Sequence, residues 1–167
     1  MSDQSRADLL RRAVTLTADV DADVLAEIFA DDVSAWSPGA STSSRDELVD
    51  ELTARDELFV DLAFDIQAVD VVGDRGYAEW TVTATPGEAL TLSEGNGDGA
   101  GVEVQGQPVT AAGVTVATFA GDTIIDLRQY WDEVAFLEAL DLLPSDDDLV
   151  DDLIAEVDRE SGADDDG

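Results

Sequence analysis

The 167-residue sequence contains no cysteine and no histidine. Without cysteine, disulfide bonds and thiolate metal sites are excluded. Without histidine, imidazole acid/base catalysis is excluded, and the commonest protein ligand of zinc is missing. Lysine is also absent, so all 8 basic residues are arginine. Carboxylates are therefore the main candidates for acid/base chemistry, and neither a metal nor a cofactor is predicted.

Long apolar segments are absent as well. No run approaches the roughly 20 apolar residues that span a bilayer. The stretch MSDQSRADLLRRAV lacks the apolar core and the small-residue cleavage site of a signal peptide. A chain of this length fits one domain that can bury a core and enclose a pocket. We therefore expect a soluble, cytoplasmic protein with no membrane partner.

Acidic residues dominate what is present. Asp and Glu number 40, of which 28 are Asp, and the formal net charge is −32. Such a charge repels the phosphate backbone, so nucleic acid is not an expected partner. Periodic apolar residues, with 44% hydrophobic content, argue against disorder. We interpret the charge as the acidic surface of a halophilic protein that works in a high-salt cytoplasm.

Helical spacing of apolar residues comes first along the chain. It predicts helices over residues 6–18 and 21–33. Ser44 with Glu47 forms a capping box, which predicts a third helix from that point. A short helix is expected over residues 133–142.

From residue 58 the apolar period changes to two, which indicates strands. The first strand is expected to bury Val60, Leu62, Phe64, Ile66 and Ala68. Strands are expected at residues 58–72, 77–85, about 102–119 and 123–131. Residues 34–42 are expected to form a turn-rich connection. Helices followed by an antiparallel meander indicate an α+β fold, in which a curved sheet wraps the N-terminal helices and leaves a conical cavity.

The domain is expected to span residues 1–144. An acidic amphipathic helix is predicted over residues 145–160 and a disordered acidic tail over 161–167. Residues 95–101, GNGDGAG, are expected to form a flexible loop.

The closing strand carries a polar face, which we expect to look into the cavity. By alternation one side of it holds Asp126, Arg128, Tyr130 and Asp132, and the other holds Ile125, Leu127 and Trp131. A carboxylate in an apolar pocket has a raised pKa and can act as a base near neutral pH. Tyr130 could donate a hydrogen bond to an enolate oxygen. Two alternatives stay open, namely that Asp132 caps the following helix and that Arg128 is part of a structural ion pair.

Three further residues are candidates for the pocket wall. Tyr77 and Glu79 share a face of an adjacent strand, where Glu79 is a second candidate acid. Trp36 is an aromatic residue in the turn-rich connection. A place in the core is the alternative for Trp36.

Several segments resemble a known family. IFADDVSAWSPG, SRDEL, EWTVTATPGE and residues 106–144 are similar to the SnoaL-like polyketide (ester) cyclases of the nuclear transport factor 2-like, or ketosteroid isomerase-like, superfamily. The resemblance covers about residues 7–144. It implies a cone-shaped, cystatin-like α+β barrel, a small hydrophobic ligand and a homodimer through the sheet. An Asp near the end of the last strand is the family's general acid/base, and Asp132 matches it. Thr85 stands where many relatives have a histidine.

Three functions follow as hypotheses. The first is a cofactor-independent cyclase or isomerase that uses Asp132 as general acid/base on a hydrophobic carbonyl substrate, oriented by Arg128 and Tyr130. The second is a non-catalytic ligand-binding or dimerisation module of the same fold. The third is epoxide-hydrolase-like activation of water by Asp126, Arg128 and Asp132.

The net charge predicts that salt stabilises the protein. At about 1 M salt the Debye length is about 3 Å, so repulsion between surface carboxylates is largely screened. We expect the midpoint of thermal unfolding to rise steadily as KCl is raised from dilute buffer to about 1 M. Circular dichroism would measure it. A midpoint that is flat or falls across this range would contradict the prediction.

Overall fold

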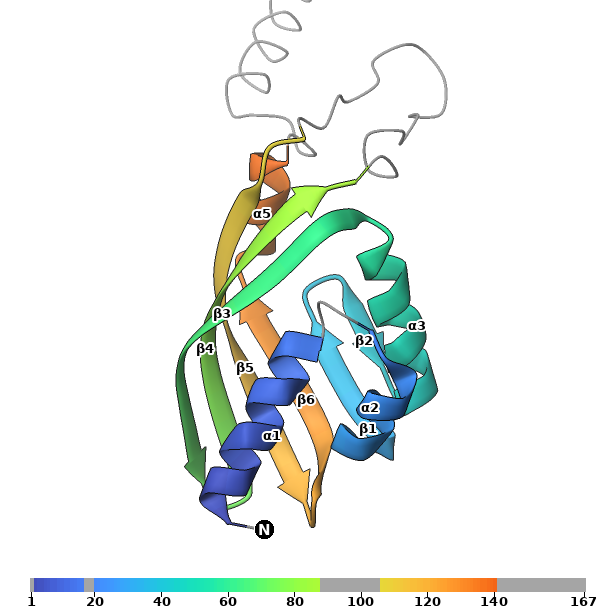
Figure 1. The fold of residues 1–167 in the computed structure, drawn as a ribbon, viewed down its shortest axis with the longest axis vertical. Helices are drawn as coiled ribbons and strands as arrows, with labels where there is room; N and C mark the ends of the chain where they lie inside the picture. The colour runs from blue at the N-terminus through green and yellow to red at the C-terminus, as the bar shows by residue number, and fades with distance from the viewer. Residues whose placement is uncertain (1, 17–19, 88–105, 141–167) are drawn as a thin grey trace, which may run out of the picture.

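The computed structural model describes residues 2–16, 20–87 and 106–140. The elements are shown in Figure 1. In chain order they are α1 (Asp3–Leu16), α2 (Ala22–Ile28), β1 (Phe29–Ser37), β2 (Ala40–Thr42), α3 (Arg45–Asp56), β3 (Phe59–Val72), β4 (Arg75–Pro86), β5 (Val109–Ala120), β6 (Thr123–Trp131) and α5 (Glu133–Ala139).

The strands form one curved sheet in the order β2-β1-β6-β5-β4-β3. Among the described residues its edge strands, β2 and β3, do not pair with each other, so the sheet formed by these residues is not closed. The α+β prediction is confirmed, with one correction to the expected antiparallel sheet. β1 pairs with β6 in parallel, while the other neighbours are antiparallel.

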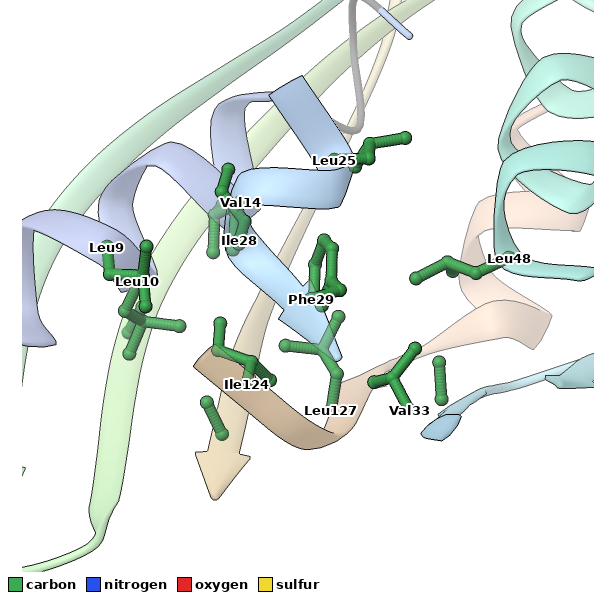
Figure 2. Packing of buried hydrophobic residues seen from close by; sticks show 14 of the residues in the cluster. Leu9, Leu10, Val14, Leu25, Ile28, Phe29, Val33, Leu48, Ile124 and Leu127 are labelled. Atoms are coloured by element: carbon green, nitrogen blue, oxygen red, sulfur yellow. The ribbon is translucent and has the colours of Figure 1, made fainter. Parts of the chain in front are cut away.

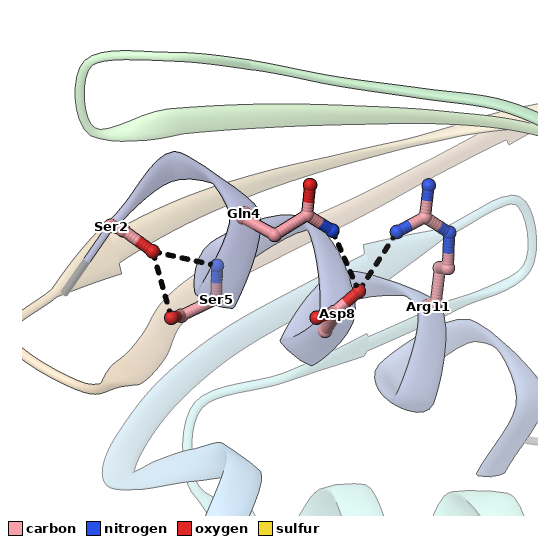
Figure 3. Close-up of polar contacts among 5 residues, drawn as sticks. All are labelled: Ser2, Gln4, Ser5, Asp8 and Arg11. Carbon is pink, nitrogen blue, oxygen red and sulfur yellow. Dashed lines mark hydrogen bonds and ion pairs between the residues drawn. The ribbon is translucent and has the colours of Figure 1, made fainter.

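Helix α1 lies across the concave face of the sheet, where it packs against β3, β4 and β5 (Figure 1). Its first turn is held by local polar contacts, drawn in Figure 3. Ser2 Oγ accepts a hydrogen bond from the Ser5 amide at 3.2 Å, which satisfies one of the free N–H groups of a helix start. Asp8 accepts from Gln4 and from Arg11, and links successive turns.

The core lies between the helices and the sheet. Figure 2 shows apolar side chains from α1, α2, β1, α3 and β6 pointing toward one another. The largest fully buried apolar side chains are Phe29, Leu10, Leu25, Ile28, Ile124, Val14 and Val33. Each contributes about 1.5–3 kcal/mol relative to an exposed position. This cluster fixes α1 and α2 against the sheet.

The second helix is shorter than predicted. It ends at Ile28, and the residues from Phe29 onward form β1 rather than a helix. The residues predicted as a turn-rich connection belong mostly to β1 and β2, which form a hairpin. The reason is the pairing of β1 with β6, more than 90 positions away in the chain. The spacing of apolar residues in IFADDV fits one turn of helix as well as it fits a strand.

The strand predictions hold for β4, which buries Ala78, Trp80, Val82 and Ala84 on one face. In β3 the predicted face is broken. Val60 is 69% exposed, and a bulge after Ile66 moves the inward face from Ala68 to Val69. In β6 the register shift leaves Ile125 exposed and buries Ile124 instead. A bulge adds one residue, so it reverses the alternation beyond it.

The third helix begins as predicted. Ser44 Oγ accepts from the Glu47 amide at 3.2 Å, and Glu47 accepts from the Ser43 amide at 2.7 Å. Those hydrogen bonds from Ser43 hold the pKa of Glu47 below its usual value. Within the described ranges, no helix is long and apolar enough to cross a bilayer. The predictions for residues 95–101, 145–160 and 161–167 lie outside the described residues.

Candidate functional site

A cavity of about 280 Å³ opens on the concave side of the sheet. Residues of α3, the β1–β2 hairpin, β3, β4, β6 and the start of α5 line it. Its volume is close to the lower end of ligand pockets, about 300 Å³. It is therefore suited to a small ligand.

Aromatic rings form much of the cavity wall. All three tryptophans of the chain, Trp36, Trp80 and Trp131, line it. Trp80 meets Phe64 edge-on with ring centroids 5.1 Å apart, and Trp131 meets Phe136 in the same way at 5.0 Å. Such edge-to-face pairs hold rings in defined positions. The wall of the cavity is therefore largely apolar and aromatic.

A few polar side chains also line the cavity: Glu51, Arg55, Gln129 and Glu133. Gln129 is only 8% exposed, and Arg55 is half-buried. Burial lowers the pKa of Arg55, while the carboxylates of Glu51 and Asp56 act in the opposite direction. The guanidinium stays charged at neutral pH. The cavity thus offers two carboxylates, one cation and one buried amide.

Glu133 lies against the tight turn between β1 and β2. Gly39 in this turn has φ +79°, a conformation that side chains disfavour. A Cβ atom on Gly39 would lie 2.7 Å from Oε1 of Glu133. The glycine therefore leaves room for the Glu133 carboxylate beside the hairpin.

The predicted polar face of β6 lies on the other side of the sheet. Arg128 and Tyr130 are exposed, and neither they nor Asp126 line the cavity. The prediction that this face looks into the cavity is wrong. Leu127 and Trp131 take the inward positions, because burying Asp126 and Arg128 would cost the hydration of two charges. The epoxide-hydrolase grouping of Asp126, Arg128 and Asp132 is therefore not assembled in the cavity.

Arg128 instead forms the ion pair that was left open as an alternative. Its Nε lies 3.1 Å from Oδ1 of Asp126. The hydrogen bond to Asp126, and next that to Tyr130, raise the pKa of Arg128. Since half of the Arg128 side chain is exposed, the pair contributes little to stability.

Asp132 caps helix α5. Its Oδ1 accepts a hydrogen bond from the Ala135 amide at 3.0 Å, so the capping alternative is confirmed. Asp132 is exposed and does not line the cavity. Its carboxylate is used for the helix start, where an acceptor satisfies a free N–H group.

Of the three remaining predicted pocket residues, one lines the cavity and two do not. Trp36 lines the cavity, and its ring packs 5.3 Å from that of Tyr130. Tyr77 and Glu79 lie on the outer face of β4 and do not line the cavity. The prediction that they face the pocket is wrong, because Ala78 and Trp80 occupy the inward positions.

Two cavity residues that were not predicted carry a signal in the sequence. Gln129 stands between Leu127 and Trp131 on the apolar face of β6, where a polar side chain interrupts the pattern. Arg55 follows Leu48 and Leu52 at helical spacing on the buried face of α3. A polar residue on an otherwise apolar face is the informative exception.

A model of the SnoaL-like domain matches residues 10–127. The chain belongs to the SnoaL-like family. Its fold is that of a candidate SnoaL-like polyketide cyclase from Jannaschia sp. CCS1, at 20% identity and TM-score 0.68, over 85% of this chain and 95% of that one. IdmH, a candidate polyketide cyclase from Streptomyces antibioticus, matches at 17% identity and TM-score 0.65, over 82% and 98%.

A third similar structure is AclR from Streptomyces galilaeus, a candidate hydroxylase. It matches at 21% identity and TM-score 0.66, over 97% of both chains. Among proteins with curated functions, none matches the chain. At these identities the solved structures establish the fold of this SnoaL-like protein and not its reaction.

The capping role of Asp132 predicts losses of different size for two substitutions. Asp132→Ala removes the acceptor, and we expect a loss of about 1 kcal/mol in the free energy of unfolding. Asp132→Asn keeps an acceptor and should cost much less, since molar salt screens the loss of charge. Denaturant unfolding in molar KCl measures both. Equal losses for Asn and Ala would show that the charge matters and the cap does not.

Proposed function

We propose that this SnoaL-like protein is a cofactor-independent enzyme of the cyclase or isomerase kind. It binds a small hydrophobic carbonyl compound in the cavity and moves a proton on it. The observation that carries the proposal is the cavity itself, in which apolar walls surround a half-buried carboxylate and a buried amide. An apolar pocket with a few converging polar groups is typical of a small-molecule site.

Glu133 is the group that we assign to proton transfer. It is half-buried on the cavity wall, whereas the neighbouring Asp132 carboxylate caps α5. Glu51 also lines the cavity, but it is exposed on α3, and its charge acts on Arg55. In the proposed step the Glu133 carboxylate takes a proton from the carbon beside the carbonyl group. The carboxylic acid so formed then returns the proton at the end of the reaction.

The names of similar structures support the same class of reaction. Both the Jannaschia protein and IdmH are candidate polyketide cyclases. Ring closure in such compounds begins with an enolate, which needs a base and a stabilised oxygen and no cofactor.

A specific observation favours one alternative, a non-catalytic ligand-binding module. The residue that matches the family's general acid/base, Asp132, is used as a helix cap. Thr85 also replaces the histidine of many relatives. A protein of this kind would bind the carbonyl compound and leave its protons in place.

Exchange of protons for deuterium separates the two functions without knowledge of the natural substrate. 1-Tetralone, a flat bicyclic ketone, can be followed by NMR in deuterated buffer with molar KCl. We expect the protein to speed exchange of the protons beside the carbonyl. Glu133→Gln should slow the catalysed exchange by about 100-fold or more, while tetralone binding, measured by tryptophan fluorescence, stays the same.

Asp132→Asn is the matched control, because it changes the adjacent carboxylate and keeps the cap. It should exchange tetralone as the unsubstituted protein does. Loss of exchange in Asp132→Asn alone would assign the base to Asp132 and contradict the role of Glu133. Binding without any catalysed exchange would favour the ligand-binding module.

We also propose that the protein is a homodimer through the outer face of the sheet. The outer face carries three large side chains on its central strands. Tyr77 on β4, Val114 on β5 and Tyr130 on β6 are 39%, 37% and 47% exposed. A solvated sheet face usually carries polar residues, and an apolar patch marks a contact surface. A second copy can cover it through the same residues, as a two-fold axis requires.

Val114→Asp is expected to convert the dimer to monomers, because it places a charge in the middle of the proposed contact. Val72→Asp is the matched control, since Val72 is 71% exposed at the end of β3. Sedimentation equilibrium in molar KCl measures the mass of each. A monomeric unsubstituted protein, or a Val114→Asp protein that stays dimeric, would contradict this interface.

A further inference from the structure

Two polar side chains are buried in the part of the chain that the structure describes, and they are neighbours. Thr115 is 0% and Gln129 8% exposed. They lie opposite each other on β5 and β6. Trp80 reaches them from β4, where its Nε1 donates a hydrogen bond to Thr115 Oγ1 at 2.8 Å. The three residues therefore form a buried hydrogen-bonded network across three adjacent strands.

The hydrogen bonds among these three residues set the orientation of the Gln129 amide. Nε2 of Gln129 lies 3.4 Å from Thr115 Oγ1, and the amide can turn so that its oxygen takes this place. The indole N–H only donates, so Thr115 accepts from Trp80 and keeps one hydroxyl hydrogen to give. The Gln129 amide lies within hydrogen-bond distance of this hydroxyl, and its oxygen can accept that hydrogen once the amide is turned. The orientation with Oε1 toward Thr115 satisfies that hydrogen, whereas the other leaves a buried donor unmet.

The favoured orientation turns the NH₂ group of Gln129 away from Thr115. Gln129 lines the cavity, and in the described residues its amide has one hydrogen-bond contact, the one to Thr115. Its two N–H donors are therefore left for the cavity, whose wall also includes the rings of Trp80 and Trp131. A neutral donor in an apolar wall is matched by a carbonyl oxygen.

Gly113 makes this arrangement possible. It lies opposite Trp80 on β5, and a Cβ atom there would come within 2.5 Å of the end of the indole ring. Without a side chain at this position the indole can lie flat over β5 and bring Nε1 to Thr115. The sequence thus supplies the N–H donor of Trp80, the Thr115 hydroxyl that accepts from it, and, at Gly113, the space that the indole ring needs.

We propose that Gln129 binds the carbonyl oxygen of the ligand and stabilises the enolate oxygen formed in proton transfer, with Thr115 and Trp80 as positioning residues. The inference rests on the proposed function, and it defines the ligand class as an oxygen acceptor held in an otherwise apolar cavity. As the proton leaves the carbon, its electron pair forms the carbon–carbon double bond, and the negative charge collects on the oxygen beside Gln129. Hydrogen-bond donors aimed at that oxygen lower the barrier.

A pair of probes that differ in the carbonyl group tests the inference. 1-Tetralone and the hydrocarbon tetralin have nearly the same shape. Their dissociation constants can be measured by tryptophan fluorescence in molar KCl. We expect the unsubstituted protein to bind the ketone about fivefold more tightly, the effect of one neutral hydrogen bond. Gln129→Met, of similar length, should bind both probes equally and slow exchange of the ketone's protons by about 100-fold.

Thr115 variants test the positioning role. Thr115→Val should reduce the preference for the ketone, and Thr115→Ser, which keeps the hydroxyl, should restore it. The ratio of the two dissociation constants does not depend on how much protein is folded. Should Gln129→Met fail to fold, Gln129→Leu and the Thr115 pair give the same comparison.

The outcomes separate this inference from the proposed function. Equal binding of both probes by the unsubstituted protein, or a preference that survives in Gln129→Met and Thr115→Val, overturns the role of Gln129 and leaves the cavity as a hydrophobic site. Absence of binding for both probes overturns the proposed function, and the inference with it. A preference lost in Gln129→Met and kept in Glu133→Gln supports the division between oxygen binding and proton transfer.

Discussion

The parallel pairing of β1 with β6 is the constraint on which the cavity depends. It joins Phe29 to Ile124 and, beyond a register shift, Trp36 to Arg128, and so adds the β1–β2 hairpin to the sheet beside its last strand. The hairpin and α3, which packs on it, then close one side of the hollow that the curved sheet leaves. Without this pairing the inner faces of β3 and β4 would have no wall opposite them at this end.

The pairing also decides which side of β6 faces the cavity. A strand between two neighbours can present one face to the core, and in β6 that face carries Leu127, Gln129 and Trp131. Asp126 and Arg128 neutralise each other at the surface, where water solvates them at little cost. The cavity is therefore mainly neutral near the sheet, and its charges come from α3 and from the start of α5.

In a site without histidine or cysteine, proton transfer and stabilisation of negative charge must be performed by carboxylates, amides and hydroxyl groups. In the proposed reaction Glu133 carries the proton, and the N–H donors of the buried Gln129 amide stabilise the negative charge on the ligand oxygen. The apolar walls strengthen both effects, because electrostatic interactions are stronger where water is excluded. Proton transfer of the proposed kind requires a base and a stabilised oxygen and no cofactor.

Local signals in the sequence were sufficient for much of the fold. Period-two alternation found β4, the capping box of Ser44 and Glu47 found the start of α3, and the segments around residues 106–144 indicated the family. These features depend on neighbours a few positions apart, so they can be seen in the chain alone. The bulges in β3 and β6 could not be seen, because each follows from a register with a partner strand.

The sequence by itself determined which ionisable and polar groups are available, namely carboxylates, arginine and amides, and it determined the strongly negative net charge. It also indicated an α+β fold whose last strand has one polar and one apolar face. Only the tertiary structure decided which face looks inward, that Asp132 is used as a helix cap, and that Glu133 and Gln129 reach the cavity. The physical reason is that a face of a strand is buried only where other elements pack on it. That cover comes from β1, β2 and α3, whose contacts with β6 lie far away along the chain.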